Sequence, residues 1–187
     1  FDNPEEYYHI LDKNKYKIAD FEELMNKIIK VYLLAGGYPE YFDTNSILLW
    51  QKRLVDDIIS RGLYRDIVSI YNIRNPEILE KLMYFIAANS GGEFSYSNIA
   101  QTLGVDTVTI SSYINYLSQA FLISTCDNYS SNIGKVIRKN KKLFITDSGI
   151  RNAMLRNNEL SPEDEGFQVE NCSVQIVRKY CEPENYS

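Results

Sequence analysis

Hydroxyl and basic side chains gather in two separate stretches of the sequence, and both kinds of side chain can bind nucleic acids. The first stretch, Asp106 to Ala120, contains no Lys or Arg and carries the candidate contact residues Thr107, Thr109, Ser112 and Tyr113. Hydroxyl groups can hydrogen-bond phosphates or base edges. The second stretch places five basic residues within eight positions, namely Lys135, Arg138, Lys139, Lys141 and Lys142. Since phosphate neutralisation supplies most nonspecific affinity, the two stretches together predict a nucleic-acid interface.

Both stretches are also compatible with roles that involve no nucleic acid. A helix without Lys or Arg binds DNA poorly by itself, because it neutralises no phosphates. A basic loop on a protein surface can simply be solvated. A domain used for packing or for protein contacts would therefore fit the same residues, and this alternative stays open.

Local signals predict the elements that would position these residues. Ser95 is placed to cap a short helix that Gly104 ends, and Asp106 is placed to cap a second helix. Strands are predicted over 121–125 and 142–146, with a polar loop over 128–140 between them. Two helices joined by a turn and backed by two strands make a winged helix-turn-helix.

Most of the remaining chain is predicted to be helical. The predicted helix starts are Asp20, Thr44 or Asn45, Pro76, Asp147 and Phe167. Glycines at 36–37 and at 62 are expected to end the first two of these helices. The polar and acidic segment 157–165 is predicted to be a mobile loop. The predicted fold class is therefore mainly α with a small β component.

Composition narrows the class of protein further. The chain has 187 residues, 44% of them hydrophobic, which suffices for one large domain or two small ones. No apolar run approaches the roughly 18 residues of a membrane span, so no membrane partner is expected. The three separated cysteines argue against a disulfide framework and a structural zinc site, and favour a reducing cytoplasm. The net charge of -5 speaks against a general nucleic-acid binder, although residues 46–149 hold eleven basic against nine acidic side chains.

Five separated strings in this sequence match one family in the same order. They are GGYPEY (36–41), YRDI (64–67), FSYSNIAQTLGVDTVTISSYINYLSQAFLI (94–123), KKLFITDSGI (141–150) and VEN (169–171). Together they resemble the C-terminal half of a family of archaeal and bacterial AAA+-type P-loop ATPases. In that family a nucleotide-binding domain is followed by a winged helix and then by a region of unknown function with a restriction-nuclease-like fold. The resemblance implies a helical, lid- or linker-like N-terminal subdomain (1–74), a winged helix domain (75–147) and the start of an incomplete nuclease-like domain (148–187).

The resemblance implies no catalytic chemistry for this part of such an ATPase. The sequence contains no Gly-x-x-x-x-Gly-Lys-Ser/Thr string that would cradle phosphates. ATP and Mg²⁺ are therefore expected only in the missing N-terminal domain, and no cofactor is expected here. Glu170 matches the helix carboxylate of the nuclease-like region, but no later strands supply its partner ligands, so no metal site is expected.

We therefore expect a non-catalytic C-terminal part of an AAA+-type ATPase that acts as a DNA-binding winged-helix module. The expected partners are duplex DNA and the N-terminal ATPase domain of the parent chain, and an oligomer is compatible with this role. One alternative is a protein-interaction domain that sets the assembly of the same ATPase. Another is a free-standing transcriptional regulator.

Overall fold

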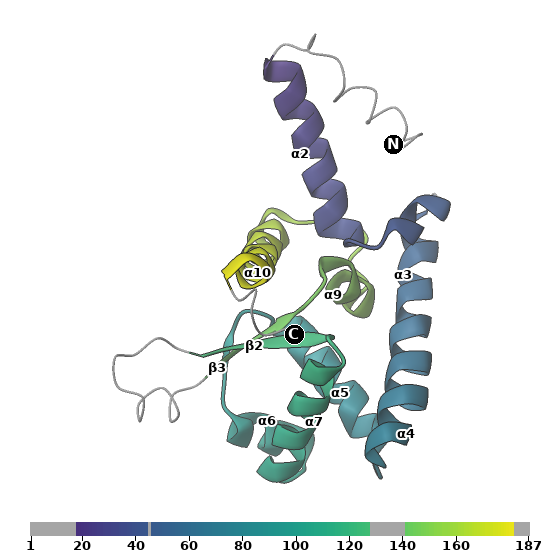
Figure 1. Ribbon diagram of the computed structural model, residues 1–187, viewed down its shortest axis with the longest axis vertical. Helices are drawn as coiled ribbons and strands as arrows, with labels where there is room; N and C mark the ends of the chain where they lie inside the picture. Colours follow the sequence, from purple (N-terminus) through teal and green to yellow (C-terminus); the bar gives the residue numbers. More distant parts are fainter. Residues whose placement is uncertain (1–17, 45, 128–140, 182–187) are drawn as a thin grey trace.

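Helices surround one small antiparallel sheet in this protein (Figure 1). The structure, a computed structural model, describes residues 18–44, 46–127 and 141–181. The predicted fold class, mainly α with a small β component, is confirmed. Within the described residues, no helix combines the length and apolar composition that a membrane span requires. The predicted loop over 128–140, including Lys135, Arg138 and Lys139, lies outside the described residues.

The N-terminal region consists of two long helical stretches. Helix α2 (Ile18–Ala35) stands out from the rest of the molecule, and the 3-10 helix η1 (Pro39–Asp43) follows its glycine turn (Figure 1). A continuous rod then runs along the right edge of the view. It comprises α3 (Ile47–Val55), the π-helical segment η2 (Asp56–Ile67) and α4 (Val68–Tyr71).

The starts of both stretches differ from the predicted ones. Helix α2 already includes Asp20, which was predicted to precede it. The cap of α3 is Ser46, whose Oγ accepts a hydrogen bond from the Leu49 N–H at 3.4 Å. The predicted cap Thr44 instead donates its hydroxyl to the Tyr41 carbonyl at 2.8 Å, so the prediction of Thr44 is wrong.

The predicted helix end at Gly62 is also wrong, because Gly62 lies inside η2. A glycine inside a helix costs about 1 kcal/mol relative to Ala. Burial of Ile59, Leu63 and Ile67 on the same segment outweighs this cost, since each buried aliphatic side chain contributes about 1.5–3 kcal/mol. The rod ends instead at Asn72, which adopts the left-handed conformation with φ 50°.

The central region contains the predicted pair of short helices and the strands behind them. In chain order its elements are α5 (Pro76–Ala88), β1 (Glu93–Phe94), α6 (Tyr96–Leu103), α7 (Thr107–Gln119), β2 (Ile123–Asp127) and β3 (Lys141–Ile145). Ser95 caps α6 and Asp106 caps α7, as predicted. Gly104 ends α6 with φ 68°, which also confirms the predicted turn.

The strands form one antiparallel sheet in the order β1-β3-β2. In the β2–β3 pair, Ile123 lies opposite Ile145 and Asp127 lies opposite Lys141. The short strand β1 adds to the other edge of β3, with Glu93 opposite Lys142. The two predicted strands are therefore present and paired, with a third short strand that was not predicted.

The C-terminal region contains α9 (Ser148–Leu155) and α10 (Pro162–Cys181). Asp147 caps α9, as predicted, through a hydrogen bond from the Ile150 N–H. The prediction of a mobile loop up to residue 165 is wrong, because α10 starts at Pro162. Ser161 accepts a hydrogen bond from the Asp164 N–H at 3.1 Å, and acidic residues in the first turn complement the helix dipole.

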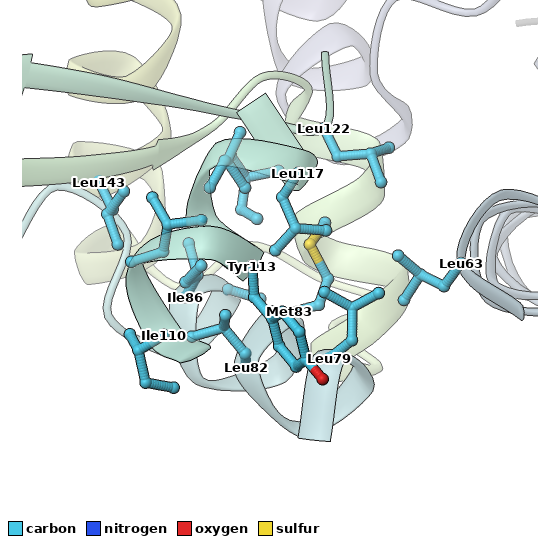
Figure 2. Close-up of a cluster of buried hydrophobic side chains, with 14 of the residues drawn as sticks. Leu63, Leu79, Leu82, Met83, Ile86, Ile110, Tyr113, Leu117, Leu122 and Leu143 are labelled. Atoms are coloured by element: carbon cyan, nitrogen blue, oxygen red, sulfur yellow. The ribbon is translucent and has the colours of Figure 1, made fainter. Parts of the chain in front are cut away.

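The main hydrophobic core lies between α5, α7 and the sheet, with η2 and α9 adding to it. Figure 2 shows Leu79, Leu82 and Met83 of α5 among Ile110, Tyr113 and Leu117 of α7. Leu63 of η2 and Ile150 of α9 belong to the same buried cluster. All three segments of the predicted division into domains thus contribute to one core, and their boundaries stay predictions.

Candidate nucleic-acid interface

Helix α7 is fixed at its start by a cap that uses one of the predicted contact residues. Both oxygens of the Asp106 carboxylate accept hydrogen bonds from Thr109, one from its N–H at 2.8 Å and one from its hydroxyl at 2.7 Å. The Thr109 hydroxyl lowers the pKa of Asp106 below its ordinary value, with help from the N–H. Thr109 is thus already engaged within the protein, and its hydroxyl is less available for a ligand than the sequence suggested.

The surface that α7 turns to solvent consists of residues spaced one helical turn apart. Thr107, Ser111 and Asn115 are exposed, and we call these three residues the outer face of α7. Val108 beside them is also exposed, at 73%. Ser112 is half-buried at the edge of this face.

Tyr113, another predicted contact residue, is largely part of the hydrophobic core. Its side chain is 8% exposed and packs in the main cluster (Figure 2). Burial raises the pKa of its hydroxyl, and the neighbouring Tyr116 and Asp106 act in the same direction. The Tyr113 ring is therefore not free to stack on a base, and any contact with a ligand is restricted to the hydroxyl end.

A cleft of about 380 Å³ lies beside the start of α7, between this helix and the turn that joins α4 to α5. We call it the α7 cleft. Its lining includes Thr109, Ser112 and Tyr113 from the predicted set, together with Arg74 and Asn75 from the turn. Arg74 is not among the predicted site residues, because a single arginine in a turn carries no local signal of where its side chain points.

The basic residues of the second predicted stretch are only partly described. Lys141 and Lys142 lie on β3 and are both half-buried. The Lys142 ammonium forms an ion pair with Glu170 of α10 at 3.0 Å. This pair offsets the charge of Lys142, so Lys142 is a weaker phosphate ligand than the sequence suggested. Glu170, which the resemblance assigned to a nuclease-like region, is engaged in the same contact.

A second polar region lies where α2 ends and α9 begins, and it joins two strings that are far apart in the sequence. The Gly37 N–H donates a hydrogen bond to the Asp147 carboxylate at 2.8 Å. Gly36 has φ 87°, and a Cβ built there would lie 2.2 Å from Oδ1 of Asp147. A Cβ on Gly149 would lie 2.1 Å from the Ala35 carbonyl oxygen. Only glycine therefore allows α2 and α9 to approach this closely.

Side chains in the same region bind the last four carbonyl groups of α2, and the Tyr32 carbonyl among them also accepts a hydrogen bond from the Gly36 N–H at 2.9 Å. Ser148 donates its hydroxyl to the Tyr32 carbonyl at 2.9 Å. Asn152 donates to the carbonyls of Leu33 at 2.8 Å and Leu34 at 2.9 Å, and Trp50 donates its indole N–H to the Ala35 carbonyl at 2.8 Å. We call the set formed by Gly36, Gly37, Trp50, Asp147, Ser148, Gly149 and Asn152 the α2–α9 junction.

Burial changes the acid–base properties of this junction. It raises the pKa of Asp147 above its ordinary value, against the lowering effect of the N–H groups of Gly37, Ile150 and Gly149. Burial also raises the pKa of the nearby Cys172 thiol to about 11, and the charge of Asp147 adds to this effect. A thiol with so high a pKa stays protonated near neutral pH, so Cys172 is a poor nucleophile.

Within the residues that the structure describes, no group of three or more His, Cys, Asp or Glu side chains is arranged to hold a metal ion. Neither Cys126 nor Cys172 forms a disulfide bond. The outer face of α7 and the α7 cleft present hydroxyl, amide and guanidinium groups that can form hydrogen bonds.

The fold and this site define a mainly helical protein with a small antiparallel sheet and one uncharged, polar helix face. Residues 26–161 match the family described as a domain of unknown function (DUF8612), and the chain belongs to this family. No solved structure matches the chain significantly.

Uncharacterized proteins of three organisms are similar to this chain. The protein of Mycobacterium tuberculosis is 29% identical over 157 residues, which are 77% of this chain and 34% of that protein. The protein of Haemophilus influenzae is 28% identical over 133 residues, or 68% of this chain and 33% of that protein. The protein of Methanocaldococcus jannaschii is 22% identical over 171 residues, which are 89% of this chain and 36% of that protein. The chain thus spans about a third of the length of these curated relatives.

Proposed function

We propose that this chain is a non-catalytic part of a longer, cytoplasmic AAA+-type P-loop ATPase, and that residues 75–147 form a winged helix domain that contacts duplex DNA. The observation that carries this proposal is the outer face of α7. Thr107, Ser111 and Asn115 are exposed on one side of a helix whose opposite side is locked into the core. Hydroxyl and amide groups presented in this way match the second helix of DNA-reading helix pairs.

Two further observations support a place within a longer ATPase. The five strings that resemble the ATPase family span residues 36–171, and two of them meet at the α2–α9 junction. The curated relatives are about three times as long as the stretch they share with this chain, which leaves room for a nucleotide-binding domain. ATP and Mg²⁺ would belong to that domain.

Positive charge near α7 sets how strongly this chain can bind DNA, because phosphate neutralisation supplies most of the affinity. Asp106 to Ala120 contains no Lys or Arg, so the positive charge has to come from outside this helix, and the stretch 135–142 holds five basic residues. About five phosphate contacts predict that the logarithm of the binding constant falls with the logarithm of salt concentration with a slope near -4.5.

The test measures binding of labelled duplex DNA by fluorescence anisotropy over a series of salt concentrations. The Lys139→Glu, Lys141→Glu double variant should bind much more weakly and with a flatter slope. The double variant Lys52→Glu, Lys81→Glu makes the same change in net charge on α3 and α5 and serves as the matched control. A flat salt response of the native chain, or equal binding by the two double variants, would remove the DNA proposal.

A specific observation favours a second candidate function, the assembly of the parent ATPase. Helix α2 carries large apolar side chains that face solvent, with Phe21 45%, Ile29 44% and Tyr32 44% exposed. Exposed apolar residues at helical spacing are typical of surfaces that contact another protein. Because α2 stands out from the core (Figure 1), it is well placed to reach a neighbouring domain or subunit.

Analytical ultracentrifugation of the chain tests this second candidate. Assembly through α2 predicts self-association that Ile29→Lys weakens at least about tenfold, because a charge replaces a buried apolar side chain at the contact. Asn26→Lys adds the same charge at an exposed polar site of α2 and should leave association unchanged. A native chain that sediments as a monomer at all concentrations would contradict self-assembly through α2.

A further inference from the structure

We infer that the α7 cleft binds a phosphate ester of a nucleic-acid backbone, with Arg74 as the cation that neutralises it. The inference deepens the proposed DNA contact and rests on it. It adds a contact residue outside the two stretches that the sequence singled out, and it gives the helix α7, which lacks Lys and Arg, a nearby positive charge.

The inference rests on the size of the cleft and on polar side chains in it that form no ion pair or helix cap with other described residues. Its volume of about 380 Å³ is in the range of small-ligand sites and holds a phosphate with its adjoining sugar. Arg74 lines it, and this exposed guanidinium forms no ion pair with any residue in the described ranges. Asn75 precedes α5 without using its side chain as a cap, so its amide is also available.

The hydroxyl of a largely buried tyrosine completes the set of donors. Tyr113 lines the cleft although nine-tenths of its side chain is buried, and its hydroxyl makes no hydrogen bond to another described residue. The hydroxyl lies at the end of the ring away from the backbone, toward the edge of the core cluster in Figure 2. A hydroxyl held in place by a packed ring is a pre-organised donor, because binding orders no further side chain.

Two tyrosines that line this cleft, Tyr71 and Tyr116, form a rigid side of it. The rings of Tyr71 and Tyr116 stack with centroids 3.8 Å apart and an interplanar angle of 12°. The Tyr71 hydroxyl also hydrogen-bonds the Gln119 side chain. These contacts join α4 to α7 across the cleft and hold its two sides at a fixed separation.

The negative charge of Asp106 should weaken the binding of an anion in the cleft, and its removal is an independent test of phosphate binding there. Its carboxylate lines the same cleft, where its charge repels phosphate, but both oxygens are turned to the N–H and hydroxyl of Thr109. Asparagine caps helices about as well as aspartate. The substitution Asp106→Asn should therefore keep α7 intact and tighten phosphate binding, which is the opposite of the effect of losing Arg74.

The experiment measures binding of labelled duplex DNA by the full chain and its variants over a series of salt concentrations. Arg74→Ala should weaken binding about tenfold and flatten the log–log salt slope by about 0.9. Tyr113→Phe, which removes only the hydroxyl, should weaken binding about threefold. Arg156→Ala removes the same side chain from an exposed position outside the cleft and should change neither quantity. Thermal melting of each variant checks that it is folded.

A second measurement separates this inference from the proposed function. A mononucleotide is titrated into the labelled chain, and the NMR signal of the Arg74 side-chain N–H is followed. If the native chain binds duplex DNA and Arg74→Ala binds it equally well, the inference is overturned while the DNA proposal stands. If the native chain ignores duplex DNA but the mononucleotide shifts the Arg74 signal, the DNA proposal fails and the cleft takes its phosphate from a free nucleotide. If neither ligand has an effect, both are overturned.

Discussion

The α2–α9 junction and the outer face of α7 are both rich in polar side chains, but they use them in opposite ways. At the junction, Asn152 is fully buried and both its donor and acceptor groups are occupied by α2 and α10. On the outer face of α7, Thr107 and Ser111 point to solvent. The first arrangement fixes one helix on another, and the second leaves hydrogen-bonding groups for a partner.

This difference explains why strings that resemble those of a known family need not mark a binding site. The strings GGYPEY and KKLFITDSGI meet at the junction, where Gly36 and Asp147 are in contact. Their residue types are dictated by close approach and by the carbonyl groups at the end of α2. The contrast predicts that substitutions at the junction change stability, whereas substitutions on α7 change binding.

The largest expected effect is that of Gly149→Ala. Its new Cβ would lie 2.1 Å from the Ala35 carbonyl oxygen, so α9 must shift away from α2. We expect a loss of about 4 kcal/mol in the free energy of unfolding, measured by urea denaturation. Gly166→Ala is the matched control, since a Cβ there meets nothing within 4 Å. It should stabilise α10 by up to about 1 kcal/mol. Equal stability of the two variants would contradict the close approach at the junction.

The next largest effect is expected for Asn152→Ala. This change leaves the carbonyls of Leu33 and Leu34 and the amide of Gln168 without their partner in a buried setting. Each buried polar group left unsatisfied costs about 1–3 kcal/mol, and we expect a total loss of about 3 kcal/mol. Urea denaturation measures it, with exposed Asn115→Ala as the control of the same residue type. A loss below about 1 kcal/mol would mean that the amide contributes little to the junction.

Asp147 should produce a smaller effect that depends on pH. Because burial raises its pKa in the folded state, the folded state holds this proton more tightly than the unfolded chain does. The resulting stability is fully present below the unfolded-state pKa and is lost as pH rises through the folded-state pKa. Asp147→Asn removes this dependence.

Urea denaturation at a series of pH values, from acidic to neutral, tests the Asp147 prediction. The free energy of unfolding of Asp147→Asn, relative to the native chain, should rise with pH over this window. Asp43→Asn, a change at an exposed acid of η1, serves as the control. A constant difference between Asp147→Asn and the native chain would show that burial does not shift the titration of Asp147.

The smallest effect on stability is expected on the outer face of α7. Ser111→Ala should change the free energy of unfolding by less than about 0.5 kcal/mol, because the hydroxyl is exposed. On the proposed function it should weaken duplex DNA binding severalfold, as measured by fluorescence anisotropy. Ser173→Ala removes the same hydroxyl from an exposed position on α10, outside the α7 cleft, and should leave DNA binding unchanged. If Ser111→Ala lowered the stability of the protein but left DNA binding unchanged, the outer face of α7 would have a structural role and not a binding role.

Sequence signals predicted the helix pair well, because its determinants are local. Ser95, Gly104 and Asp106 each act within one helical turn, and each has the predicted role. The helix start at Pro162 was missed although Ser161 and Asp164 form a local cap, because the acidic composition favoured a loop. The predicted helix end at Gly62 is wrong because burial of the neighbouring side chains outweighs the low helix propensity of glycine.

The candidate site was less predictable, because it depends on contacts between distant residues. Arg74 lies about thirty residues before α7 in the sequence and reaches the cleft only through the packing of α5 on α7. Likewise, nothing near Lys142 indicates that Glu170 pairs with it. The spacing of Tyr113 along α7 fits both a core position and the proposed DNA-binding face, and only packing shows that its ring belongs to the core.

The most direct test of the contrast between the two regions is an NMR titration of the isotope-labelled chain with duplex DNA, read at the backbone amides of both. The account predicts chemical-shift changes at Thr107, Ser111 and Asn115 that saturate with DNA and vanish at high salt. It also predicts unchanged signals at Gly37, Ser148 and Asn152. Shifts confined to the junction, or no shift in α7 at low salt, would contradict it.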